Sequence, residues 1–185
     1  FNIWGKHKDF EQSSDLFSLQ INQSISPKFG NYQDTILLVD ENQKDVSSSA
    51  GHSLMDHHPF SIDRYAIANK NTSALKIILE NGDLFGFCDL VEKEALMLHS
   101  LMMSSSPSYV LMKPQTLEIM NEIKTFRNMN NVPVCFTLDA GANVHVLYPE
   151  KDSKSVTDFI NAKLSKYCFQ GKFITDHVGK GPVII

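Results

Sequence analysis

One acidic residue stands out because of the segments on either side of it. Asp139 follows an apolar run at residues 132–138 and precedes a second one at residues 144–148, and the turn between them has the sequence DAGAN. A carboxylate held between two strand-like segments can act as a general base or orient a hydroxyl group. Gly141 permits backbone conformations that other residues avoid and removes a side chain that would block a ligand. The alternative is a hairpin turn whose Asp is solvated and bonds nearby backbone amides.

A serine-rich segment at residues 46–52, with the sequence VSSSAGH, is the second candidate. The hydroxyls of Ser47, Ser48 and Ser49, together with unhindered backbone amides, could hold an anion, above all if a helix begins there. His52 lies close to these hydroxyls in the sequence and could meet the same ligand. A solvated connection between two elements is the alternative.

Three other histidines are candidate ligands or bases. His57 and His58 are adjacent and therefore point to different sides of any regular element. No Asp or Glu at ligand spacing completes a site with them, so no metal is expected. His99 lies within an apolar helical pattern, where a histidine bonded to a backbone carbonyl is favoured over direct catalysis.

The composition is that of an ordinary globular protein, with 42% hydrophobic and 21% charged residues among 185. A net charge of -4 argues against a nucleic-acid partner, because phosphate neutralisation needs clustered Lys and Arg. Only two arginines occur, Arg64 and Arg127, so bidentate contacts to a phosphorylated ligand would come largely from elsewhere. The cysteines form no CxxC pair and indicate a reducing, cytoplasmic setting.

The two ends of the chain raise separate expectations. No stretch has the length needed to cross a bilayer, so no membrane partner is expected. The chain begins at Phe1 rather than Met, and residues 1–5 read like the middle of a strand. We therefore expect the natural protein to continue upstream.

The spacing of hydrophobic residues predicts strands mixed with helices. The predicted strands lie at residues 35–40, 132–138, 144–148, 172–174 and 182–184, and the predicted helices at residues 59–80, 83–103, 114–128 and 155–167. Because a tight turn joins the two central strands, they should be antiparallel. The pattern indicates an α+β fold in which an antiparallel sheet packs against helices.

The order of the motifs resembles that of the diphosphomevalonate decarboxylases, which belong to the GHMP kinase superfamily. The serine-rich segment comes first, His99 follows, and residues 136–143 complete the set. The resemblance covers essentially the whole chain but only the C-terminal part of the family's enzyme. It implies that residues 34–185 form the C-terminal GHMP-like lobe, and that residues 1–33 are the end of a preceding N-terminal lobe.

The implied reaction is ATP-dependent. The 3-hydroxyl of diphosphomevalonate is phosphorylated, and phosphate and carbon dioxide then leave to give isopentenyl diphosphate. The resemblance implies that Asp139 is catalytic and orients or deprotonates this hydroxyl, while the backbone amides of Ala140 and Gly141 meet the substrate carboxylate. The segment that helps hold the diphosphate or the substrate backbone aligns with Ser47, Ser48, Ser49 and His52.

Several positions depart from the family's pattern. Ala142 stands where members commonly have Pro, and some members have Arg at Ser49 and Met at His52. Loss of that Arg would remove a strong charge-assisted contact to the diphosphate. The family's ATP loop and decarboxylation residues have no counterpart here, because they belong to the preceding lobe. The resemblance thus implies ATP and Mg²⁺ for the complete enzyme, no cofactor site in this part, an inactive chain in isolation, and a possible homodimer.

Two other functions remain open. A small-molecule kinase of the same superfamily would phosphorylate its substrate without decarboxylation. A non-catalytic interaction module would use the antiparallel sheet as its binding surface, with Asp139 exposed outside any cleft and a large apolar patch elsewhere.

Overall fold

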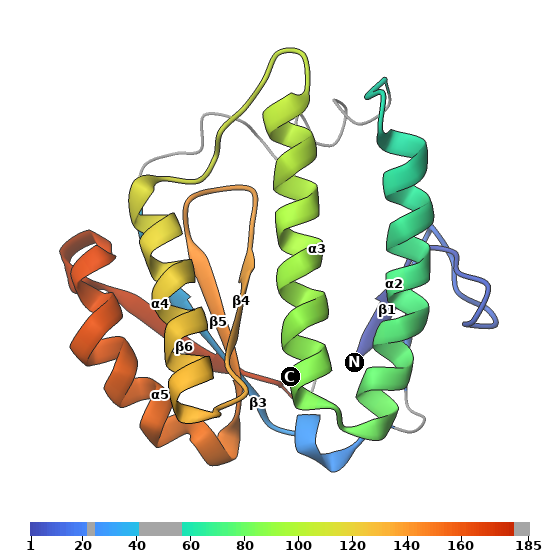
Figure 1. The fold of residues 1–185 in the computed structure, drawn as a ribbon. Coiled ribbons are helices and arrows are strands. Elements are labelled where there is room, and N and C mark those ends of the chain that lie inside the picture. The colour runs from blue at the N-terminus through green and yellow to red at the C-terminus, as the bar shows by residue number, and fades with distance from the viewer. Residues whose placement is uncertain (22–24, 41–56, 180–185) are drawn as a thin grey trace, which may run out of the picture.

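The computed structural model describes residues 1–21, 25–40 and 57–179. At its centre lies a four-stranded antiparallel sheet with the strand order β4-β5-β3-β6 (Figure 1). Its strands are β3 (Tyr32–Leu37), β4 (Cys135–Leu138), β5 (Val144–Pro149) and β6 (Phe173–His177). A separate hairpin pairs β1 (Asn2–Trp4) with β2 (Ser18–Gln20).

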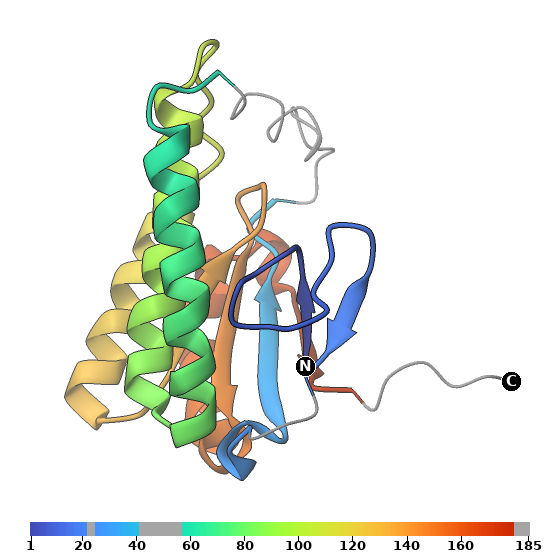
Figure 2. The same ribbon diagram turned by 90° about the vertical axis from the view of Figure 1, so that its right-hand side faces the viewer.

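Helices cover one side of this sheet. The α-helices are α2 (Ser61–Asn81), α3 (Leu84–Ser104), α4 (Pro114–Asn130) and α5 (Ser153–Phe159). The π-helical turn η3 (Ile160–Leu164) and the 3-10 turn η4 (Ser165–Tyr167) continue α5, and further 3-10 turns are η1 (Pro27–Phe29), η2 (Glu150–Asp152) and η5 (Phe169–Gly171). Figure 2 shows α2, α3 and α4 forming a layer on one side of the sheet, which confirms the predicted fold class. Within the described ranges, none of these helices combines the length and hydrophobicity that a membrane crossing requires.

The boundary between α2 and α3 follows from local sequence. Gly82 adopts the left-handed conformation with φ 67°, and its N–H bonds the carbonyl oxygen of Ile78. Glycine ends helices in this way because it lacks the Cβ that would clash. Asp83 then caps α3 by accepting a hydrogen bond of 2.9 Å from the Gly86 N–H.

The main core lies between the sheet and the helices α4 and α5. Its almost fully buried members come from all three parts: Leu37, Phe136, Val144 and Val146 from the sheet, Ile119 and Ile123 from α4, and Val156, Ile160 and Leu164 from α5 and η3. A smaller cluster of Phe29, Tyr32, Leu79 and Leu84 packs at the start of β3. The chain therefore holds the sheet rigidly from one face and at one end.

Several predicted strand boundaries differ from the structure: the strand predicted at residues 132–138 begins only at Cys135, and the one predicted at residues 172–174 spans Phe173–His177. The strand predicted at residues 35–40 spans Tyr32–Leu37 instead. It ends early because the N–H groups of Val39 and Asp40 both donate to the side chain of Asn143 rather than to a neighbouring strand. The predicted strand at residues 182–184 lies outside the described residues.

Candidate active site

Asp139 lies in the short connection between β4 and β5. Leu138 and Val144 are paired across the two strands, so residues 139–143 link directly opposed strand ends. The Asp139 side chain is partly buried, and its Oδ1 atom is shielded from water. Ala142 in the same connection is buried against the main core. The Asp139 carboxyl group thus lies in a short hairpin connection, partly buried against the protein.

Helix α3 fixes this connection from one side. His99 is 2% exposed, and its Nε2 lies 3.0 Å from the backbone carbonyl oxygen of Asp139. Because the acceptor is a carbonyl, the ring nitrogen must be the donor. Burial lowers the pKa of His99 from its ordinary value of 6.5, and so the ring is neutral near pH 7. The interpretation of His99 as a buried histidine bonded to a backbone carbonyl is confirmed.

Helix α4 fixes the connection from a second side. Thr116 is fully buried and donates a 2.7 Å hydrogen bond to the carbonyl oxygen of Ala142. The same hydroxyl accepts from the N–H of Lys113, which caps the start of α4. Sequence reasoning missed this residue. Its position in the first turn after Pro114 predicts a cap, but no local signal points to a partner 26 positions away.

Asn143 ties the connection to the end of β3. Its Oδ1 accepts hydrogen bonds of 2.9 Å from the Val39 N–H and 3.1 Å from the Asp40 N–H. Asp40 also forms an ion pair with Lys113 at the start of α4. The end of β3 and the connection that carries Asp139 are therefore bonded to each other.

A buried ion pair sets the position of α3 along β4. Glu92 and Arg127 are 5% and 9% exposed and form two hydrogen bonds of 2.6 and 3.1 Å. Arg127 also donates to the Val134 carbonyl, and Glu92 accepts from the Phe136 N–H. Its bond with Glu92 raises the pKa of Arg127.

The distance between the Glu92 and His99 contacts is about the same along α3 as along the chain from Phe136 to Asp139. Seven residues of helix separate Glu92 from His99, a rise of about 10 Å. Three residues of strand separate Phe136 from Asp139, again about 10 Å. The equal spacing allows both contacts to form without strain, and together they prevent α3 from sliding along the strand.

Both arginines of the sequence have protein partners. Arg127 binds Glu92, and Arg64 binds Glu94 with an N–O distance of 2.6 Å. A guanidinium group paired with a carboxylate in this way has little capacity left for a phosphate. Contacts to a phosphorylated ligand would therefore come from lysines, backbone amides or another part of the protein.

The remaining predicted site residues fall into two groups. Ser47, Ser48, Ser49 and His52 lie outside the described residues. His57 and His58 diverge as expected, because His57 is exposed while His58 is buried and lies 3.1 Å from the Ser104 hydroxyl. In the described part of the chain, no group of three His, Cys, Asp or Glu residues could hold a metal ion.

Gly141 differs from expectation in one respect. Its φ angle is not in the left-handed region, so the turn does not require glycine for its backbone conformation. Its N–H donates 2.8 Å to the carbonyl of Asp139, so a substrate carboxylate would compete with that carbonyl. Ala140 and Gly141 are both partly buried beside Asp139.

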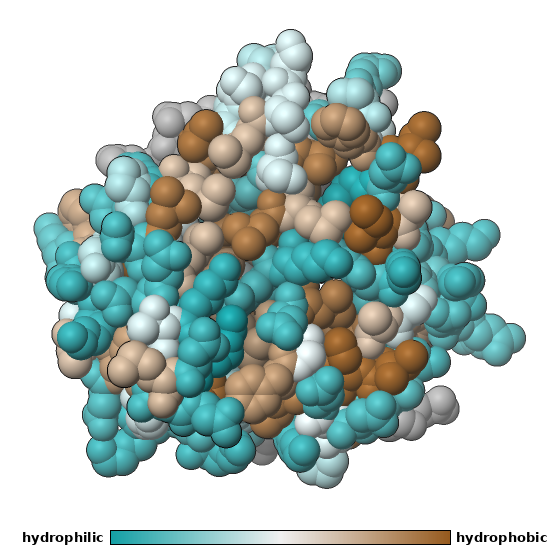
Figure 3. Space-filling model, in the orientation of Figure 1, coloured by the Kyte–Doolittle hydropathy of each residue, from teal (hydrophilic) through white to brown (hydrophobic). Residues whose placement is uncertain are grey.

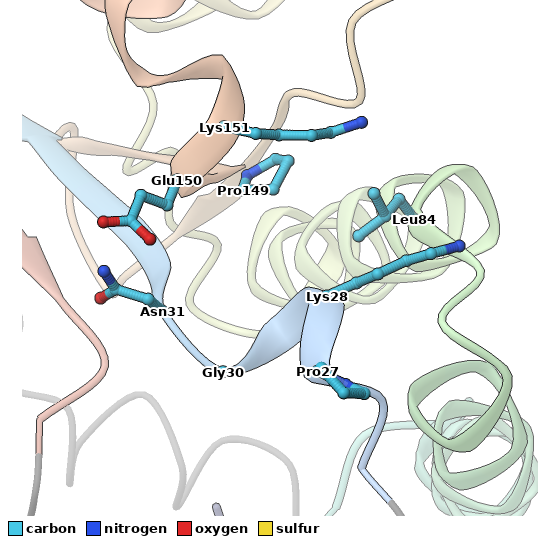
Figure 4. Close-up of a pocket in the computed structure, with 8 residues that line it drawn as sticks. All are labelled: Pro27, Lys28, Gly30, Asn31, Leu84, Pro149, Glu150 and Lys151. Atoms are coloured by element: carbon cyan, nitrogen blue, oxygen red, sulfur yellow. The ribbon is translucent and has the colours of Figure 1, made fainter.

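Two pockets of the described surface lie away from Asp139. One, of 460 Å³, is at the opposite end of the sheet, where β5 ends (Figure 4), and is lined by Pro27, Lys28, Gly30, Asn31, Leu84, Pro149, Glu150 and Lys151. A second, also of 460 Å³, follows the outer side of α3 and reaches Lys124 of α4. Figure 3 shows hydrophobic residues interspersed with hydrophilic ones on the helical face.

Comparisons with known proteins all point to decarboxylases of mevalonate phosphates. The family model for the mevalonate 5-diphosphate decarboxylase C-terminal domain matches residues 35–184. Phosphomevalonate decarboxylase from Haloferax volcanii is 28% identical over 105 residues, which cover 57% of this chain and 32% of that protein. Diphosphomevalonate decarboxylase mvd1 from Aspergillus fumigatus is 25% identical over 132 residues, which cover 70% of this chain and 33% of that protein. The chain spans about a third of the length of these curated relatives.

Solved structures support the fold. Mevalonate diphosphate decarboxylase from Staphylococcus aureus matches with a TM-score of 0.77 and 19% identity, over 91% of this chain and 50% of that one. A complex of the enzyme MDDEF with MVAPP, AMPPCP and magnesium matches with a TM-score of 0.68 and 23% identity, over 78% of this chain and 43% of that one. That enzyme therefore crystallises with an ATP analogue and Mg²⁺.

Proposed function

Because this chain belongs to the mevalonate 5-diphosphate decarboxylase C-terminal domain family, we propose that it acts as the C-terminal lobe of an ATP-dependent diphosphomevalonate decarboxylase. The observation that carries the proposal is the anchoring of the Asp139 connection. Hydrogen bonds from α3 and α4 and a side-chain link to the end of β3 hold the backbone that carries one partly buried carboxylate. Such anchoring is typical of a side chain that must meet a reacting atom in a fixed geometry.

The proposed role of Asp139 is to orient the substrate's 3-hydroxyl and take its proton. An ionised carboxylate only accepts hydrogen bonds, so it selects the hydroxyl orientation in which the proton points toward it. A positioned base of this kind contributes about 10²- to 10⁴-fold to the rate. Ala140 and Gly141 would contact the substrate carboxylate, and Ser47, Ser48, Ser49 and His52 would contact its diphosphate or backbone.

The described residues do not fit an ATP or Mg²⁺ site. Both guanidinium groups are bound to carboxylates, and the described residues contain no cluster of metal-ligating side chains. We therefore assign ATP and Mg²⁺ to an N-terminal lobe, and we call this chain together with that lobe the complete enzyme. The 185-residue chain assayed by itself should release no carbon dioxide from diphosphomevalonate and ATP.

A second substrate has specific support. The relative with 28% identity is named for phosphomevalonate, which carries one phosphate fewer. The use of Arg64 and Arg127 in internal ion pairs also reduces the positive charge available for a diphosphate. A phosphomevalonate decarboxylase is thus the second candidate.

Product analysis separates these candidates. The complete enzyme is given ATP with diphosphomevalonate or with phosphomevalonate, and carbon dioxide and inorganic phosphate are measured separately. Equal release of both products from diphosphomevalonate supports the first proposal, and preferential turnover of phosphomevalonate supports the second. Consumption of ATP with a stable phosphorylated product and no carbon dioxide would identify a kinase and contradict both.

A further inference from the structure

The carbonyl oxygen of Asp139 receives two hydrogen bonds from different parts of the protein. The His99 ring donates from α3 at 3.0 Å, and the Gly141 N–H donates from within the turn at 2.8 Å. The two bonds fix the plane of the peptide group that follows the Asp139 Cα. Because the direction of the Cα–Cβ bond follows from the backbone, they also limit where the carboxyl group can point.

The ring of His99 suits this task because it is neutral and buried. It can donate one hydrogen bond without placing a positive charge beside Asp139. A lysine or arginine in the same place would favour an ion pair with the carboxylate and reduce its basicity. The ring is also fixed along β4, because Glu92 holds the same helix two turns earlier.

From this geometry we propose that His99 is a positioning residue that directs the Asp139 carboxylate toward the substrate. It acts through the main chain of Asp139 and makes no contact with the substrate. This inference rests on the proposed function, in which Asp139 meets the substrate hydroxyl.

Two substitutions of His99 test the proposal in the complete enzyme. His99→Gln carries an amide nitrogen that can reach the position of Nε2, whereas the side chain of His99→Asn is shorter by one methylene. With His99→Gln, kcat should stay within about threefold of the wild type. With His99→Asn, kcat should fall about 10- to 100-fold while KM changes less than about threefold, because a displaced carboxylate affects the reaction more than substrate binding.

His7 provides the matched control. Its ring is 8% exposed, and its Nε2 lies 2.8 Å from the backbone carbonyl oxygen of Asn69, so it makes the same kind of bond away from Asp139. His7→Asn should leave kcat unchanged. Equal losses of kcat in His7→Asn and His99→Asn would show a merely structural role and overturn the proposal.

A spectroscopic readout is independent of turnover. In the 185-residue chain, His99→Asn should shift the amide NMR resonances of Ala140 and Gly141, and His7→Asn should leave them in place. Unshifted resonances in His99→Asn would overturn the proposal. If Asp139→Asn keeps its activity, the proposed function fails; if Asp139→Asn is inactive while His99→Asn has normal kcat, only the positioning role fails.

Discussion

Two of the polar contacts that join helix α3 to strand β4 and to the turn after it differ in kind. Near the middle of the helix, Glu92 forms a buried ion pair with Arg127 of α4, and the pair also bonds the backbone on both sides of β4's first residue. Two turns later, the neutral ring of His99 bonds the carbonyl of Asp139. One contact is charged and made of several bonds, and the other is a single neutral bond.

The two contacts should therefore contribute differently to the stability of the fold and to catalysis. Breaking a buried ion pair leaves an uncompensated charge in the interior. Loss of the Glu92 contact should therefore decrease the free energy of unfolding strongly. A single neutral hydrogen bond contributes less to stability. Changes at His99 should therefore affect the placement of the Asp139 carboxylate more than they affect folding. We therefore expect Glu92 to hold the helix in place and His99 to position the candidate site.

Arg127→Leu should produce the largest loss of stability. It leaves Glu92 buried without its partner, and the expected decrease in the free energy of unfolding is about 3–5 kcal/mol. Urea denaturation followed by circular dichroism measures this. The double variant Glu92→Leu/Arg127→Leu removes both charges and should recover part of the loss. If Arg127→Leu decreases the free energy of unfolding by less than about 1 kcal/mol, the Glu92 contact does not stabilise the fold as we expect, and it no longer differs from the His99 contact in this respect.

Thr116→Val should have an intermediate effect. It removes the hydroxyl that bonds the buried carbonyl of Ala142 and caps α4, and the expected loss is about 1–3 kcal/mol. Thr125→Val on the exposed side of the same helix is the control and should change little. Equal melting temperatures for the two variants would mean that the hydrogen bond between Thr116 and Ala142 does not stabilise the fold.

The pH dependence of stability should give the smallest effect. Burial lowers the pKa of His99 in the folded chain, so below pH 6.5 the unfolded chain binds a proton that the folded chain does not. The free energy of unfolding should therefore decrease as pH falls below 6.5, by at most about 1.4 kcal/mol per pH unit for this one group. In His99→Gln this part of the pH dependence should vanish. Parallel curves for the wild type and the variant between pH 7 and 5 would contradict the depressed pKa.

Local signals in the sequence predicted most of the helices and the fold class. The left-handed Gly82 ends α2 where the Asn–Gly pair indicated, and the two apolar runs around Asp139 form the paired strands β4 and β5. Such features depend on residues within a few positions of one another. The antiparallel arrangement followed from the tight turn between the strands.

The anchors of the candidate site could not be predicted in the same way. His99 reaches Asp139 across 40 positions, and Thr116 reaches Ala142 across 26. Asn143 is the last residue of the turn with the sequence DAGAN, but its bonds to the end of β3 depend on tertiary packing. The same bonds explain why the predicted strand at residues 35–40 ends early, since a side chain replaced the strand partner.

In the proposed function, Asp139 acts on the substrate, and the hydrogen bonds around it only hold it in place. The most direct measurement compares Asp139→Asn with the wild-type complete enzyme by single-turnover release of carbon dioxide and by urea denaturation, with Asp158→Asn on the exposed side of α5 as the control. We predict a loss of at least about 100-fold in the rate for Asp139→Asn, with a nearly unchanged free energy of unfolding and a normal control. Near-normal release of carbon dioxide by a folded Asp139→Asn variant would contradict the claim.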